Sequence, residues 1–113
     1  HQGVVHGIVA PHVLQYLFDS VDGRRDLLAA ALGVASADTD ANADATAEAV
    51  VDAVVDVRDD LGLPTRLRAI DGLAWSGLDD VAERIVDDPL IGTVPVGLDP
   101  SVADVRAVLE AAW

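Results

Sequence analysis

The sequence predicts an all-α protein in which residues 1–113 form a single compact bundle of about five helices. Three observations favour this class. Apolar residues recur at helical spacing along most of the chain, and no segment predicts a strand. The apolar residues are mainly Ala, Val and Leu, whose small side chains suit closely packed helices. A chain of 113 residues is long enough for one hydrophobic core and too short for two.

Residues 3–20 and 24–32 form the first two predicted helices, joined by a turn. In the first, apolar residues recur every four or five positions. Pro11 removes a backbone hydrogen bond near its middle, so we expect this helix to be bent or divided in two. In the second, Gly33 follows the last apolar residue, where many helices end. The apolar face of the second helix is expected to consist of Leu27, Leu28, Ala31 and Leu32.

The clearest helical pattern covers residues 43–61, with an apolar stripe on one side and aspartates outside it. Gly62 and Pro64 end this helix, and a single helical turn is expected around residues 67–70. The preceding segment, residues 34–42, is small and acidic without periodicity. Such a composition indicates a solvated loop between the second and third helices.

Two capping boxes are expected at the starts of the last two helices. Ser76 with Asp79 predicts the start of a helix that ends before Pro89. Ser101 with Asp104 predicts the start of a helix that reaches the end of the chain. The segment between these two helices is rich in Gly and Pro, which indicates an irregular conformation.

The charge of the chain argues against two classes of partner. There are 20 acidic residues and 7 basic ones, all of them Arg, for a net charge of −13. Nucleic acids and anionic membranes bind cationic surfaces, so neither is an expected partner. Asp outnumbers Glu by 17 to 3, a pattern typical of proteins kept soluble in concentrated salt. The alternative is a GC-rich genome that favours Asp, Ala, Val and Arg codons.

Cysteine is absent, so the chain has no disulfide, thiolate metal site or cysteine nucleophile. No apolar run approaches the roughly 20 residues needed to span a bilayer, and the first residues do not resemble a signal peptide. We therefore expect a cytoplasmic protein.

His1, His6 and His12 are the candidate nitrogen ligands for a metal. Their spacings of five and six residues do not place two of them on one helix face, as a spacing of four would. A complete metal site is therefore not expected, although one His could contribute to a site completed elsewhere. The aspartates lack the spacing of a calcium loop and indicate a solvated surface. Arg24 and Arg25 are expected in surface ion pairs with Asp22 or Asp26 rather than in an anion site.

Five segments of the chain contain motifs of a known family. They are residues 3–14 (GVVHGIVAPHVL), 25–34 (RDLLAAALGV), 60–67 (DLGLPTRL), 78–87 (LDDVAERIVD) and 104–113 (DVRAVLEAAW). In this order they resemble the C-terminal part of iron-containing (group III) alcohol dehydrogenases, whose first segment is roughly H-G-x-x-N/H-A-x-x-L-P-H-V. The order of the motifs, more than any one of them, makes the resemblance specific.

The resemblance implies a protein of several hundred residues, of which this chain is the C-terminal helical domain without the N-terminal nucleotide-binding domain. That missing α/β domain would bind NAD or NADP, while the helical domain closes over an alcohol, aldehyde or keto-acid substrate. A divalent metal, iron or zinc, would be held by an Asp and three His. It would polarise the substrate oxygen during hydride transfer. This chain by itself would then lack the groups that perform the reaction.

Only the last of these metal ligands would fall inside this chain, at the position of Gln2. Glutamine substitutes poorly for imidazole, so either His1 takes the role through a local shift or the ligand has been lost. His6 matches a second His that is frequent in maleylacetate reductases, a branch of the family that reduces a keto acid. It would contact a substrate carboxylate or the metal, or else pack against a neighbouring residue. His12 matches a common family His and is expected to be structural.

Two other interpretations stay open from the sequence. The first is a non-catalytic descendant, in which the helical domain serves interaction or assembly and has lost the metal site. The second is an unrelated acidic helical protein whose similarity follows from its Ala-, Val- and Leu-rich composition. An apolar face left uncovered by a missing domain would also favour association of the chain into a homo-oligomer.

Overall fold

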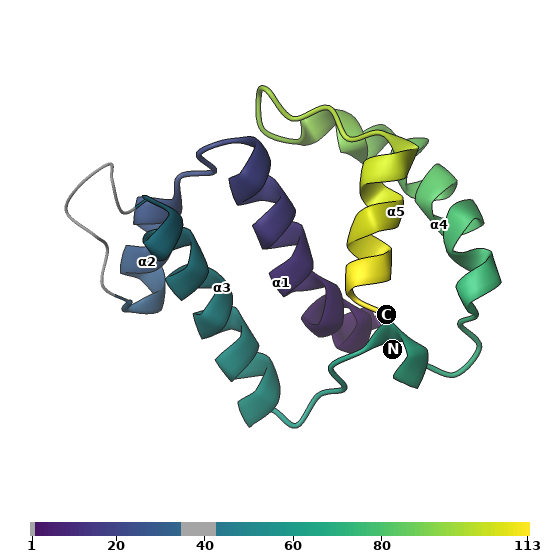
Figure 1. Cartoon of the computed structure of the whole chain (residues 1–113), viewed down its shortest axis with the longest axis horizontal. Helices are drawn as coiled ribbons and strands as arrows, with labels where there is room; N and C mark the ends of the chain where they lie inside the picture. The colour runs from purple at the N-terminus through teal and green to yellow at the C-terminus, as the bar shows by residue number, and fades with distance from the viewer. Residues whose placement is uncertain (1, 35–42) are drawn as a thin grey trace.

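The structure describes residues 2–34 and 43–113, and within them it contains five α-helices and three short 3-10 helices (Figure 1). This computed structural model contains no β-strand within those ranges, which confirms the predicted all-α class. The loop expected at residues 34–42 lies, from residue 35 onward, outside the described residues. The α-helices are α1 (Gln2–Ser20), α2 (Arg25–Leu32), α3 (Ala43–Asp60), α4 (Leu78–Val86) and α5 (Val102–Ala111), and the 3-10 helices are η2 (Leu67–Ala69), η3 (Trp75–Gly77) and η4 (Pro89–Thr93).

The helices form a flat array with α1 in the middle (Figure 1). α1 packs against α3 on one side and α5 on the other, while α2 packs on α3 and α4 packs on α5. The extents of the Cα trace are 43 × 34 × 20 Å, and so thin an array encloses few side chains completely. None of the described helices is long and apolar enough to cross a bilayer.

The buried side chains fall into two clusters on opposite sides of α1. The cluster on the α4 and α5 side, called the Ile8 cluster, consists of Ile8, Leu67, Leu78, Ala82, Leu109 and Ala112. The cluster on the α2 and α3 side, called the Phe18 cluster, consists of Phe18, Ala29, Ala47 and Val50. α1 is thus the one α-helix that contributes buried residues to both clusters.

α1 continues without a break through Pro11, so the expectation of a helix divided in two is wrong. A proline in a helix interior removes one backbone hydrogen bond and costs about 3 kcal/mol. Pro11 is itself buried, and Ile8 and Phe18 anchor the helix in the core before and after it. Tertiary packing on both sides of α1 offsets the local cost of the proline.

Left-handed backbone conformations precede and follow α2. Gly23, at the predicted turn, and Arg24, predicted as the first residue of the helix, have φ angles of 61° and 54°. Gly33 follows the helix with a φ of 70°, as predicted, and its N–H donates to Ala30 O at 3.2 Å. Glycine is favoured at such positions because it has no Cβ to collide with the neighbouring backbone.

The buried face of α2 differs from the prediction. Leu27 and Leu32 were expected inside, but they are 56% and 41% exposed, and Ala31 is exposed as well. The helix instead buries Ala29 and the side chain of Arg25. Leu28 of the expected face does pack against the Phe18 cluster. The buried face is nevertheless turned toward Ala29 and Arg25, whose guanidinium hydrogen bonds hold the start of α2 against the end of α1.

The capping box predicted at the start of α5 is confirmed. Ser101 precedes the helix, and its Oγ accepts a hydrogen bond from Asp104 N at 3.1 Å. In return, Asp104 Oδ2 accepts from Ser101 N at 2.9 Å. Each side chain therefore satisfies a backbone N–H that the helix leaves without a partner. The Ser101 hydroxyl, which donates to Asp104 Oδ2 at 2.7 Å, and then the Ser101 N–H lower the pKa of the Asp104 carboxyl group below its ordinary value.

The capping box predicted at the start of α4 is wrong. Ser76 lies inside the 3-10 helix η3, and α4 begins after Gly77 with no side-chain cap. Asp79 pairs instead with Arg106 of α5, at 2.7 Å between carboxylate and guanidinium. An interhelical ion pair has thus taken the place of the expected local hydrogen bonds, which sequence spacing could not indicate.

Candidate functional site

The two histidines that the structure describes both lie on α1, on different sides of the helix. His6 is exposed, whereas His12 is partly buried. They are six positions apart, and at 3.6 residues per turn their side chains diverge by about 120°. Gln2 is exposed in the first turn of α1, and His1 lies outside the described residues. The structure therefore does not bring His6 and His12 together as a pair.

Within residues 2–34 and 43–113, no group of three or more His, Cys, Asp or Glu side chains is arranged to hold a metal ion. A structural or catalytic zinc takes three or four protein ligands, and other divalent metals have similar needs. The described residues could therefore contribute only part of such a site.

His12 lies among cationic neighbours. Its partial burial, followed by the charges of Arg66 and Arg58, lowers the pKa of the imidazole below its ordinary value. Arg58 is held by Asp59 at 2.7 Å, and the Arg66 guanidinium donates to Ala111 O at 3.2 Å. A neutral imidazole results, which can both donate and accept a hydrogen bond.

Three segments that are far apart in the sequence meet around the first half of α1 (Figure 1). A Cβ added to Gly7 would lie 2.8 Å from Leu63 Cδ1, so the absence of a side chain at Gly7 permits this close approach. Leu67 N donates to Ala112 O at 2.8 Å, which joins η2 to the end of α5. Residues 3–14, 60–67 and 104–113 are therefore in contact at one end of the molecule.

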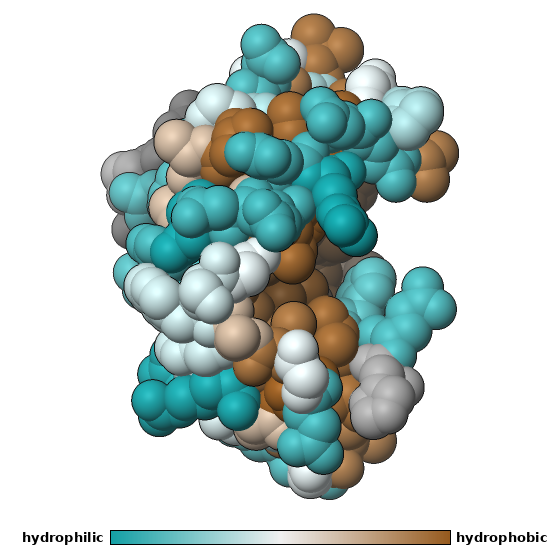
Figure 2. All heavy atoms as spheres, turned by 90° about the vertical axis from the view of Figure 1, so that its right-hand side faces the viewer, coloured by the Kyte–Doolittle hydropathy of each residue, from teal (hydrophilic) through white to brown (hydrophobic). Residues whose placement is uncertain are grey.

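A large apolar groove lies beside this end, between α1 and the pair formed by α4 and α5. Its volume is about 590 Å³. Figure 2 shows a brown, hollowed surface between two lobes of the molecule. The residues lining it are Val5, Val9, Val13, Tyr16, Leu67, Ile70, Asp71, Gly72, Leu73, Leu78, Val81, Ile85, Ile91, Val94, Leu98, Pro100, Val105, Val108 and Leu109.

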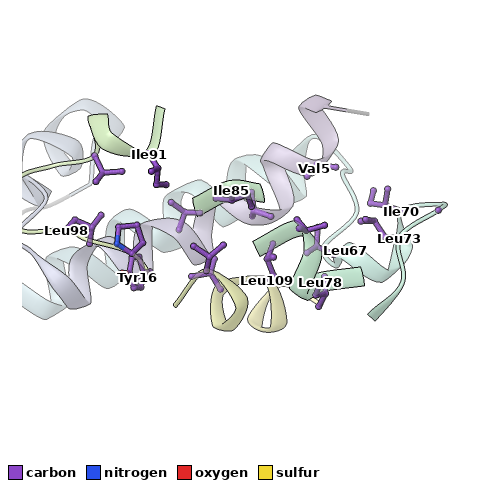
Figure 3. Close-up of a pocket in the computed structure, with 18 of the residues that line it drawn as sticks. Val5, Tyr16, Leu67, Ile70, Leu73, Leu78, Ile85, Ile91, Leu98 and Leu109 are labelled. Atoms are coloured by element: carbon purple, nitrogen blue, oxygen red, sulfur yellow. The ribbon is translucent and has the colours of Figure 1, made fainter. Parts of the chain in front are cut away.

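The groove follows α1 along much of its length (Figure 3). Val5, Ile70 and Leu73 are at one end, and Tyr16 is at the other. The lining side chains are aliphatic except for the Tyr16 phenol and the Asp71 carboxylate, and the lining contains no Arg or His. Such a surface suits the binding of apolar groups.

The groove was not predicted from the sequence. The residues that α1 contributes to it, Val5, Val9, Val13 and Tyr16, recur at spacings of four, four and three. This apolar stripe was one available signal. It could not be separated from ordinary core packing, because a buried stripe and the wall of a groove have the same periodicity.

Arg25 forms an ion pair with the expected partner Asp22, but from a buried position rather than at the surface. Only 8% of the residue is exposed, and its guanidinium donates to Phe18 O at 3.0 Å and Val21 O at 3.3 Å. It also lies over the Phe18 ring, 5.3 Å from the centroid. The expected partner Asp22 is present, at 3.6 Å. Arg25 thus connects the end of α1 to α2 rather than binding an external anion.

Comparisons of the chain with protein-family models, curated proteins and solved structures found no match.

Proposed function

We propose that this chain is the helical, substrate-side domain of an NAD(P)-dependent, metal-assisted oxidoreductase of the iron-containing alcohol dehydrogenase type. Its substrate would be an alcohol, an aldehyde or a keto acid. The observation that supports this proposal best is the contact between residues 3–14, 60–67 and 104–113, three segments in which the resemblance to that family resides.

The contact is informative because composition alone does not require it. A chance similarity of Ala-, Val- and Leu-rich segments does not require these particular segments to adjoin. Here Gly7 and Leu63, each within a family motif, approach so closely that a methyl group on Gly7 would displace Leu63. The backbone bond from Leu67 to Ala112 joins the second motif to the last one.

In this proposal, His6 is the residue of the chain that contacts the substrate, since its side chain is exposed beside the contact of the three segments. Gln2 occupies the position of the last metal ligand, one turn earlier on the same helix. The donors of the described residues do not fit a metal held by this chain alone, because they form no group of three. We therefore assign the metal and the nucleotide to the N-terminal domain and derive no step through them.

The first test is the reading frame upstream of the His1 codon. It is expected to encode a Gly-rich nucleotide-binding turn, followed by an Asp-x-x-x-His pair and a further His. A frame that begins at His1 would overturn the proposal.

The second test uses the protein encoded by the complete frame. Restoring an imidazole with Gln2→His is expected to raise the affinity for Fe²⁺ or Zn²⁺ at least about tenfold, as metal sites gain from one proper ligand. Gln15→His, at another exposed Gln of α1, is the matched control and should leave metal affinity unchanged. Equal effects of both changes would contradict the assigned position. His6→Gln should lower kcat/KM with little change in metal content.

The non-catalytic alternative is favoured by one observation, the apolar groove of about 590 Å³. A helical interaction domain would use that surface and need neither metal nor nucleotide. Metal content and NAD(P)-dependent turnover of the complete protein discriminate the two functions, because the alternative predicts neither.

A further inference from the structure

The groove is a trough with two helical sides. Along α1, its lining extends from Val5 to Tyr16, a separation of eleven positions, or about 17 Å at the rise of an α-helix. The opposite side comes from α4 and η4, and the base from α5, which packs on both α1 and α4. The trough is therefore about three helical turns long.

The sides of the trough expose apolar side chains to water. Val13 on α1 is 47% exposed and Ile85 on α4 is 37% exposed, although both line the groove. Water inside the groove finds few hydrogen-bond partners, because an ordered water needs two to four polar partners and the only polar side chains of the lining are Tyr16 and Asp71. Covering this surface with apolar groups is favourable.

An α-helix can bind in this apolar groove because its backbone N–H and C=O groups are already hydrogen-bonded within the helix. An extended peptide would bring backbone N–H and C=O groups into an apolar trough that offers them almost no hydrogen-bond partners. A helix satisfies those groups internally and presents side chains from one face. A small molecule would remain partly wet, because the trough opens to solvent on the face seen in Figure 2.

The charges around the trough determine which charged residues are favourable beside the apolar stripe of that helix. Acidic residues outnumber basic ones in the lining or within two positions of it along the sequence: they are Asp71, Asp79, Asp80, Glu83, Asp87, Asp99, Asp104 and Glu110, against Arg66, Arg68, Arg84 and Arg106. The chain as a whole has a net charge of −13. A helix with Lys or Arg beside its apolar stripe complements this rim, whereas one with Asp or Glu is repelled.

We propose that the groove between α1, α4 and α5 binds one amphipathic α-helix of a protein partner, with its apolar stripe in the trough and basic residues beside the acidic rim. This goes beyond the proposed oxidoreductase function, since the binding requires neither nucleotide, metal nor substrate.

The probe is a synthetic amphipathic helix of Leu and Lys, about 18 residues long so that it is helical in water. Its controls are the same peptide with Glu in place of Lys and a scrambled Leu/Lys peptide without a stripe. Calorimetric titration of the chain is expected to show binding of the first peptide at least about tenfold tighter than of either control. Equal binding of the scrambled peptide would overturn the proposal in favour of unspecific charge attraction.

Two variants locate the binding. Val13→Asp places a carboxylate in the trough at a residue that is already 47% exposed, and it should weaken peptide binding at least about tenfold. Val57→Asp is the matched control, at a residue of α3 that is 55% exposed and does not line the groove. It should change binding less than about twofold, because it adds the same charge elsewhere. Equal losses in both variants would overturn the assignment.

Ile85→Asp provides an independent check from the opposite side of the trough and should also weaken peptide binding, with helix content verified by circular dichroism. Two further outcomes would overturn the proposal. One is tight binding of the neutral dye N-phenyl-1-naphthylamine, abolished by Val13→Asp, without binding of the helical peptide. The other is a dimer of the chain in sedimentation that Val13→Asp dissociates, because the groove would then bind a second copy.

Discussion

The two sides of α1 are built from similar side chains but differ in how completely they are filled. On the α2 and α3 side, the Phe18 cluster is closed, with Ala29 and Val50 fully buried. On the α4 and α5 side, Ile8 and Leu78 are equally well buried, yet a groove of about 590 Å³ lies beside them. Small aliphatic residues can therefore form a core without closing the surface around it.

The reason lies in the order of the helices. α3 packs directly on α1, and α2 packs on α3 near the end of α1, so that three helices enclose the Phe18 cluster. On the other side, α5 lies between α1 and α4. The groove is the space that this order leaves between α1 and α4.

The largest expected effect is a break in the Ile8 cluster. Leu78 is 1% exposed, so Leu78→Ala should lower the free energy of unfolding by about 3 kcal/mol, measured by urea denaturation. Ile85→Ala, on the same helix but 37% exposed at the groove, should cost about 1 kcal/mol. Equal losses of stability in the two variants would mean that the groove is closed in solution. The two sides of α1 would then not differ in how completely they are filled.

The next effect concerns the closed side. Arg25→Met removes the hydrogen bonds to Phe18 O, Val21 O and Asp22 O, and should cost about 2 kcal/mol in the same measurement. Arg24→Met changes an exposed neighbour and should cost less than about 0.5 kcal/mol. A loss below about 1 kcal/mol for Arg25→Met would show that packing, rather than these hydrogen bonds, closes the Phe18 side.

A smaller effect, that of salt on stability, should act on both sides of α1 together. The net charge of −13 predicts self-repulsion that salt screens, so raising KCl from about 0.1 M to about 1 M should stabilise the chain. A gain of about 1 kcal/mol would raise the melting temperature by about 4 °C. An unchanged melting temperature would remove the interpretation of the acidic surface as an adaptation to salt.

The smallest expected effect is a pH dependence at His12. Its pKa is lowered in the folded chain by burial and by Arg66 and Arg58, so the unfolded chain binds the proton more readily. The contribution of the neutral imidazole to stability is present above the unfolded pKa of about 6.5. It is lost as the pH falls from there toward the lower folded pKa.

His12→Gln should flatten the stability profile in this acidic window, whereas the exposed His6 serves as the control through His6→Gln. Thermal melts at a series of pH values measure both. The same slope in the chain and in His12→Gln would show that burial and the arginines do not act on this imidazole.

Local signals account for the parts of the fold that the sequence predicted correctly. Gly33 after α2 and the box of Ser101 with Asp104 act within a few residues, so spacing alone identifies them. The box at Ser76 failed because Asp79 finds Arg106 across the helix pair. Tertiary contacts of this kind leave no local pattern.

For the candidate site as well, the sequence indicated the local features and not the tertiary contacts. The sequence identified His6 and His12 as candidates, but not that Arg66 and Arg58 would surround His12, because these residues come from other parts of the chain. The groove depends on the separation of α1 and α4 by α5, which no single helical stripe encodes. The proposed metal position at Gln2 and the proposed role of His6 stay predictions.

The position of α1 between two clusters has a consequence for hydrogen exchange. A helix opens locally only if the contacts on all its sides are released together. α1 is held through Ile8 on one side and Phe18 on the other, so its central amides exchange only when both clusters come apart. α2 and η4 border one side each and can open alone. The slowest amides of the molecule therefore belong to the helix that contains its buried proline, and their exchange reports the global stability of the fold.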